Sequence, residues 1–115
     1  MTLHLYGIRN CDTVKKARAW LDEQGVAYML HDYKVEGVDP ALLERWCAQV
    51  GWGALLNRAG TTFRKLDEAS RADIDDAKAQ ALMISSPSLI RRPVIEHPDG
   101  LLVGFKPELY AATLG

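Results

Sequence analysis

The stretch over residues 6–17 is the feature that most constrains how this chain folds. A short alternating strand over residues 2–6 stops at Gly7, and an amphipathic helix is expected over residues 13–24. Gly7 and Asn10 mark a tight loop between the two elements. The chain therefore changes from strand to helix within a few residues, which places this loop at the N-terminal end of a helix.

The elements that follow complete a βαβ unit. Asp12 or Thr13 is expected to cap the helix, and Gly25 to end it. Residues 28–33 have the pattern of a second strand. Two strands joined by a helix within about thirty residues predict a parallel pair with a right-handed crossover.

The pattern is helical from residue 36 to residue 90. Asp39 and Pro40 supply an N-cap followed by a proline at the first helical position. A basic loop is expected at residues 58–66, and further helical segments at residues 54–57, at 72–83 and after the Ser86-Pro87 pair. No convincing strand is found in this region.

Strand signals return near the C-terminal end. Residues 92–96 and 101–105 predict a hairpin around an Asp-Gly turn, and Pro107 opens a closing helix over residues 108–114. The order β-α-β, helical insert, β-β-α predicts an α/β, thioredoxin-like fold with an all-helical insertion between the second and third strands. We expect a single domain over residues 1–115, with its core at 1–35 and 91–115 and the insert at 36–90.

Composition excludes several classes of function. A formal net charge of −1 argues against a direct nucleic-acid binder or a membrane-surface protein. No apolar run approaches the ~20 residues of a membrane helix, and the chain starts directly with a strand, without a signal-peptide pattern. The two cysteines, Cys11 and Cys47, do not resemble a secreted disulfide framework. A cytoplasmic monomer is expected.

Cys11 is the candidate nucleophile. It lies at or beside a helix N-terminus, where free N–H groups and the helix dipole stabilise a thiolate. Arg9, Lys15 and Lys16 add positive charge nearby. The alternative is a small residue that fills a tight strand-to-helix corner.

The chain lacks a neighbouring pair of redox cysteines, because position 14 is Val14. A disulfide formed at Cys11 must be resolved by Cys47 or by an external thiol. Cys47 lies on the apolar face of a predicted helix and is interpreted as a core residue, so glutathione is the simpler choice. No tightly bound cofactor is expected, and no metal, since the three histidines lack ligand spacing with either cysteine.

Several cations are candidates for binding an anion at Cys11. Thioredoxin-like folds place a cis-proline before the third strand, facing the cysteine, and Pro93 suits this role. Arg92 would then direct its planar guanidinium at Cys11, although a solvated arginine ahead of an edge strand is the alternative. The remaining candidate anion-binding residues are Arg58 and Arg64 in the basic loop, Lys106 before Pro107, and Asn10 and Lys15 beside the cysteine.

These residues make the whole chain resemble the ArsC/Spx family, which includes glutaredoxin-coupled arsenate reductases, Spx regulators and YffB-type proteins. The matching motifs lie at residues 6–17, 55–66, 90–94 and 104–107. The second motif, from Leu55 to Leu66, looks most like the YffB branch. The resemblance implies a thioredoxin-like domain with a helical insert, Cys11 as the attacking thiolate, and Arg92 beside the cis-proline as a residue that binds an oxyanion or thiol adduct.

Departures from the family pattern narrow the expected activity. Arsenate reductases of the family hold arsenate with three arginines and place a histidine four residues before the cysteine. Here Arg92 matches one arginine, Lys106 and Asn57 occupy the other two positions, and Gly7 replaces the histidine. These differences predict a protein that is poor with arsenate.

Two classes of function remain. The first is a glutathione-dependent thiol or oxyanion reductase that uses Cys11, with glutathione as co-substrate and glutaredoxin as a second candidate partner. The second is an Spx-like regulatory protein that binds RNA polymerase. The lone cysteine with its nearby arginines favours the reductase, while Val14 removes the C-x-x-C pair of redox-switching Spx proteins.

Overall fold

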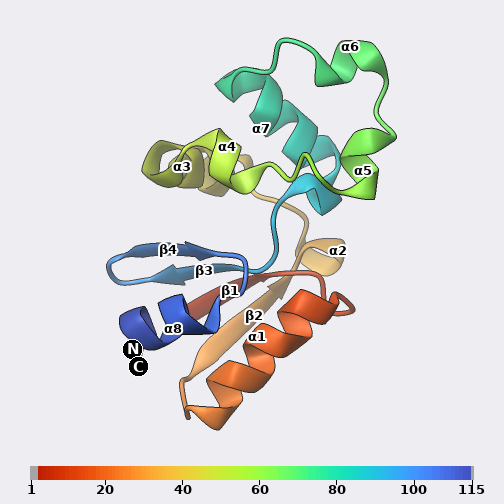
Figure 1. Ribbon diagram of the computed structural model, residues 1–115. Helices are drawn as coiled ribbons and strands as arrows, with labels where there is room; N and C mark the ends of the chain where they lie inside the picture. Colours follow the sequence, from red (N-terminus) through yellow and green to blue (C-terminus); the bar gives the residue numbers. More distant parts are fainter. Residues whose placement is uncertain (1–2, 115) are drawn as a thin grey trace. The chain divides into compact units, whose positions relative to one another are not determined.

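The computed structural model describes residues 3–114 and divides into two compact units (Figure 1). Residues Val38–Arg91 form one, which we call the helical unit. The chain on either side of it forms the other, which we call the sheet unit. The first residue of the predicted N-terminal strand, Thr2, lies outside the described residues.

The sheet unit is built on a four-stranded mixed sheet in the order β2-β1-β3-β4. The first two strands pair in parallel, and β3 is antiparallel to both β1 and β4. The strands are β1 (Leu3–Gly7), β2 (Tyr28–Asp32), β3 (Val94–His97) and β4 (Gly100–Val103). This order and these directions confirm the predicted α/β arrangement of β-α-β followed by β-β-α.

Two helices cover one face of this sheet, as Figure 1 shows: α1 (Asp12–Glu23) and α8 (Pro107–Leu114). Alternate residues of β1 point into the core beneath them, so His4 and Tyr6 lie on the opposite face. The buried core residues are Leu3, Leu5, Val14, Ala17, Leu21, Ile95, Leu102 and Tyr110. This core fixes the first turn of α1 against the ends of the central strands.

The helical unit contains α3 (Pro40–Val50), α4 (Trp52–Leu55), α5 (Thr61–Arg64), α6 (Glu68–Arg71), α7 (Asp76–Ser85) and the 3₁₀ turn η1 (Pro87–Leu89). Asp39 caps α3 by accepting a hydrogen bond from the Ala41 N–H, as the sequence predicted. Within residues 38–91, all of which are described, extended pairing is limited to an isolated bridge between Leu56 and Ile90.

Some predicted boundaries in the sheet unit are wrong. Gly7 is the last residue of β1, paired with Asp32, rather than part of the loop. Neither Asp12 nor Thr13 caps α1, because Cys11 itself is the N-cap residue. Tyr33 does not end β2 but begins the short helix α2 (Tyr33–Glu36), since the Asp32 carboxylate accepts a hydrogen bond from the Lys34 N–H and caps a new turn.

The helical unit also differs from the sequence pattern. The segment expected at 54–57 is shifted to Trp52–Leu55, because Leu56 pairs with Ile90 instead. The basic loop contains the helical turn α5. The helix expected over residues 72–83 is α7, which begins later, at Asp76, because Asp75 caps it. The separate turn α6, capped by Asp67, precedes this range and was not predicted.

Candidate active site

Cys11 occupies the N-cap position of α1. Its own N–H donates to the Ile8 carbonyl at 3.0 Å and closes the turn after β1, and its carbonyl accepts from the Lys15 N–H at 3.0 Å. The Arg9 N–H donates to the Asp32 carboxylate at 3.2 Å and ties this turn to the end of β2. The half-buried thiol therefore stands at the positive end of a helix, in a loop held on both sides.

The surroundings of Cys11 lower the pKa of its thiol. Partial burial is the largest effect and raises the pKa, but backbone N–H groups of Val14 and Thr13 and the Arg92 side chain together outweigh it. Arg92 acts both through a hydrogen bond to the sulfur and through its charge. All three groups are donors directed at the sulfur, so they stabilise negative charge that is placed on it. The thiolate is the nucleophilic form of cysteine.

Pro93 lies beside this loop. The Arg92–Pro93 peptide bond is cis, as expected for the proline before the third strand of a thioredoxin-like fold. A Cβ placed on Gly7 would lie 3.9 Å from the Pro93 Cα and 2.8 Å from Val14 Cγ2. The end of β1, the first turn of α1 and the buried proline thus meet at one point, which explains why position 7 carries a glycine.

The other predicted residues of the sheet unit are more peripheral. Asn10 and Lys15 flank Cys11 and are exposed, as is Arg9. Lys106 is exposed directly ahead of α8, where its carbonyl accepts from the Tyr110 N–H. The groups that lower the Cys11 pKa are thus the helix end and Arg92, and the role of Asn10, Lys15 and Lys106 stays a prediction.

Arg58 and Arg64 belong to the helical unit. The Arg58 guanidinium lies over the Trp52 ring, 5.3 Å from its centroid, a cation–π contact. Arg64 is the exposed last residue of α5. Their part in binding an anion at Cys11 also stays a prediction.

Cys47 has the surroundings of a core residue. It lies on the buried face of α3 and is 7% exposed. Burial and the negative charge of Asp76 both raise the pKa of its thiol. The two cysteines therefore differ in the direction of their pKa shift, which favours Cys11 as the reactive thiol.

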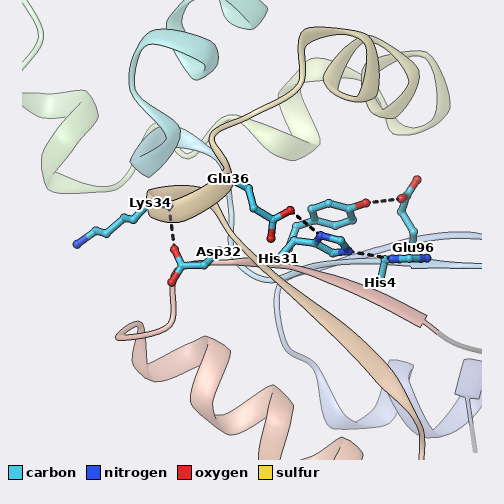
Figure 2. Close-up of polar contacts among 7 residues, drawn as sticks. His4, His31, Asp32, Lys34, Glu36 and Glu96 are labelled. Carbon is cyan, nitrogen blue, oxygen red and sulfur yellow. Dashed lines mark hydrogen bonds and ion pairs between the residues drawn. The ribbon is translucent and has the colours of Figure 1, made fainter.

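Sequence reasoning missed a polar cluster on the face of the sheet opposite α1 and α8, which Figure 2 shows. His31 lies between His4 and Glu36, with 2.9 Å from its Nε2 to His4 Nδ1 and 2.9 Å from its Nδ1 to Glu36 Oε1. The Tyr6 ring stacks on His31 at a centroid distance of 4.5 Å. The alternation of the two strands signals which face these residues share, but only the register brings His4, Tyr6 and His31 together.

Tyr33 was also missed. Its ring is 5% exposed, and its hydroxyl has no hydrogen-bond partner among the described residues. Burial raises the pKa of this phenol far above its usual range, the nearby Tyr6 raises it further, and the charge of Arg92 opposes both. A buried phenol that stays protonated is a hydrogen-bond donor.

Two further features are absent from residues 3–114. No group of three or more histidine, cysteine or acidic side chains in this part of the chain is placed to hold a metal ion. None of its helices has the length and apolar character needed to cross a membrane.

Comparison with known proteins finds relatives of the ArsC and Spx types. A model described as the ArsC family matches residues 6–113. The solved structure of a YffB protein is 62% identical, covers 98% of this chain and 99% of its own, and superposes with a TM-score of 0.95. An arsenate reductase (ArsC) related protein from Brucella melitensis is 53% identical, with 98% and 94% coverage and a TM-score of 0.80. The global transcriptional regulator Spx of Streptococcus mutans is 29% identical over 91% of this chain and 77% of its own length.

Proposed function

The chain belongs to the ArsC family, and on that premise we propose that it is a glutathione-dependent thiol or oxyanion reductase with Cys11 as its nucleophile. The observation that carries the proposal is the lowered pKa of a half-buried thiol placed between the N-terminus of α1 and Arg92. A family relationship to an arsenate reductase related protein supports the reaction class. Glutathione is the proposed co-substrate, glutaredoxin a second partner, and a cytoplasmic monomer the proposed form.

The proposed reaction is a pair of thiol–disulfide exchanges. The Cys11 thiolate attacks the glutathione sulfur of a mixed disulfide, so that a Cys11–glutathione disulfide forms and the substrate thiolate leaves. The thiolate of a second glutathione then attacks the glutathione sulfur of that adduct, releasing glutathione disulfide and the Cys11 thiolate. Over both exchanges, the substrate–glutathione disulfide and one free glutathione become the substrate thiol and glutathione disulfide, and the proton of the free glutathione passes to the substrate thiolate.

The chain's own groups assist each step. The N–H groups of Thr13 and Val14 and the Arg92 guanidinium stabilise negative charge on the Cys11 sulfur. This stabilisation keeps Cys11 ionised before attack and makes it a good leaving group in the second exchange. Arg92 also offers a planar pair of donors to a carboxylate or oxyanion on the bound molecule.

The direct test is the site of glutathione addition. The reduced protein is treated with glutathione disulfide at neutral pH and analysed by mass spectrometry of its peptides. We expect the adduct on Cys11, its loss in Cys11→Ser, and its persistence in Cys47→Ser. An adduct found first on Cys47, or none on either cysteine, would overturn the proposal.

The similarity to Spx supports a second candidate function, an interaction with RNA polymerase. This function predicts binding of the purified protein to RNA polymerase that survives the Cys11→Ser substitution. Such binding, together with an unreactive Cys11, would favour the regulator over the reductase.

A further inference from the structure

Tyr33 differs from the other tyrosines of the chain. The chain has four tyrosines, all within the described part. In three of them the hydroxyl is hydrogen-bonded: Tyr6 donates to Glu96 at 3.0 Å, Tyr110 donates to the Gly104 carbonyl at 2.7 Å, and Tyr28 accepts from Arg18 at 3.2 Å. Tyr33 has no such partner, although it is 5% exposed. A buried hydroxyl without a partner destabilises the free protein, and native proteins rarely keep one.

The position of Tyr33 connects it to the cysteine loop. Tyr33 follows Asp32 directly, and Asp32 pairs with Gly7 at the end of β1. The two oxygens of the Asp32 carboxylate accept from the Arg9 N–H, at 3.2 Å, and from the Lys34 N–H, at 2.8 Å. One carboxylate therefore holds both the turn that leads to the cysteine and the first turn of α2, as the bond from Lys34 to Asp32 in Figure 2 illustrates.

Arg92 links the phenol to the thiol. The charge of Arg92 lowers the pKa of the Tyr33 hydroxyl, and the same side chain lowers the pKa of the Cys11 thiol through hydrogen bonding and charge. Because burial keeps the phenol protonated, its hydroxyl can donate to an acceptor that arrives with a ligand. The most suitable acceptor is an anionic oxygen, since Arg92 attracts the same group.

We infer that the Tyr33 hydroxyl is a ligand-binding donor, which hydrogen-bonds an anionic oxygen of the molecule held at Cys11 and Arg92. The inference rests on the proposed function for the identity of that site. The oxygen belongs either to a carboxylate of glutathione or to an inorganic oxyanion, and two probes separate these sources. Tyr33 thus helps to fix the ligand, while Cys11 carries the chemistry.

The experiment measures how well each probe protects Cys11 from alkylation, in a Cys47→Ser background. The probes are S-methylglutathione, which has the carboxylates of glutathione but no free thiol, and sulfate. Tyr33→Phe removes the hydroxyl alone, and Tyr28→Phe is the matched control because the Tyr28 hydroxyl already has a partner, the Arg18 side chain on α1. We expect Tyr33→Phe to weaken the binding of at least one probe by about tenfold, as measured by its protection of Cys11. Tyr28→Phe should leave the binding of both probes unchanged.

Stability gives a second, independent readout. Tyr33→Phe loses no hydrogen bond in the free protein, so its urea midpoint should equal or exceed that of the parent. A lowered midpoint with unchanged protection by both probes would assign Tyr33 a purely structural role and overturn the inference. Protection by neither probe in the parent would overturn it as well.

The two proposals fail separately. If Cys11 forms no glutathione adduct but Tyr33→Phe still weakens sulfate protection, the reductase proposal fails and the role of Tyr33 stands. If the adduct forms on Cys11 and both probes bind the parent and Tyr33→Phe equally, the inference fails and the reductase proposal stands.

Discussion

The side chain of Arg92 lowers the pKa of the Cys11 thiol through hydrogen bonding and charge, although the two residues lie near opposite ends of the chain. The sheet explains how they meet. Val94, two residues after Arg92, pairs with Tyr6 on β1, and β1 leads through a single turn to Cys11. The antiparallel pairing of β1 with β3 thus places the Arg92 guanidinium near the N-terminus of α1.

Arg92→Lys tests the value of the guanidinium. Lysine keeps the charge but cannot form two parallel hydrogen bonds, so glutathione addition at Cys11 should slow by about tenfold or more. The free energy of unfolding should barely change, because the side chain is only half-buried. Mass spectrometry of the time course measures the rate. The exposed neighbour Arg91 provides the matched control, and equal slowing in Arg91→Lys and Arg92→Lys would refute the specific role.

Arsenate should be a poor substrate. Charge-assisted contacts contribute roughly 1.5–3 kcal/mol each, and loss of one in the transition state slows a reaction about tenfold or more. Lys106 is a point charge where the reductases carry an arginine, and Val14 occupies the space that a side chain at position 7 would need.

The assay is arsenite formation with glutathione and glutaredoxin supplied, run beside thiol–disulfide exchange on the same preparation. We expect weak or absent arsenate turnover while exchange at Cys11 survives. Vigorous turnover would show that Arg58 and Lys106 replace the missing arginines.

Much of this architecture follows from local sequence signals. The cis bond at Arg92–Pro93 was expected from the thioredoxin-like order of elements, whereas strand alternation and the Asp39–Pro40 cap are local signals of elements that the structure confirms. These signals are short-range, because each depends on the chemistry of one residue and its immediate neighbours.

Features that depend on pairing between distant segments were not predictable in the same way. Nothing local indicates that Leu56 bonds to Ile90 and so shifts α4, or that His4 and His31 become partners across β1 and β2. The missing partner of Tyr33 is likewise a property of the folded environment. The capping role of Cys11 was missed because cysteine is not among the preferred N-cap residues.

The histidine pair predicts an unusual tautomer. If Glu36 is ionised, His31 must donate to it from Nδ1, which leaves Nε2 to accept from His4 Nδ1–H. Both neutral rings should then carry their proton on Nδ1. Long-range ¹H–¹⁵N NMR spectra at alkaline pH, with His97 as the internal comparison, report the tautomer directly. Protons on Nε2 in both His4 and His31 would contradict the network.

The stability of the protein should depend on the ionisation of Cys11. Folding lowers the pKa of this thiol, so between the folded pKa and the ordinary value of 9.0 the unfolded chain binds more protons. The stability contributed by the thiolate is fully present above 9.0 and is lost as the pH falls through the folded pKa. The unfolding free energy of the parent minus that of Cys11→Ser should therefore rise with pH across this window.

For Cys47→Ser, the unfolding free energy of the parent minus that of the variant should instead fall with pH, because folding raises the pKa of the Cys47 thiol. Its contribution is present at low pH and is lost as the pH rises through the folded pKa. Urea unfolding at a series of pH values measures both differences. A difference for Cys11→Ser that stays flat or falls with rising pH would show that the folded protein does not favour its thiolate.

The pH dependence of Cys11 alkylation tests the central claim most directly. In a Cys47→Ser background, the rate constant for reaction with iodoacetamide is measured across the titration of the thiol. The N-terminus of α1 and Arg92 should bring the midpoint below the ordinary value of 9.0. A midpoint at or above 9.0 would show that Cys11 is an ordinary thiol and would contradict its assignment as the nucleophile.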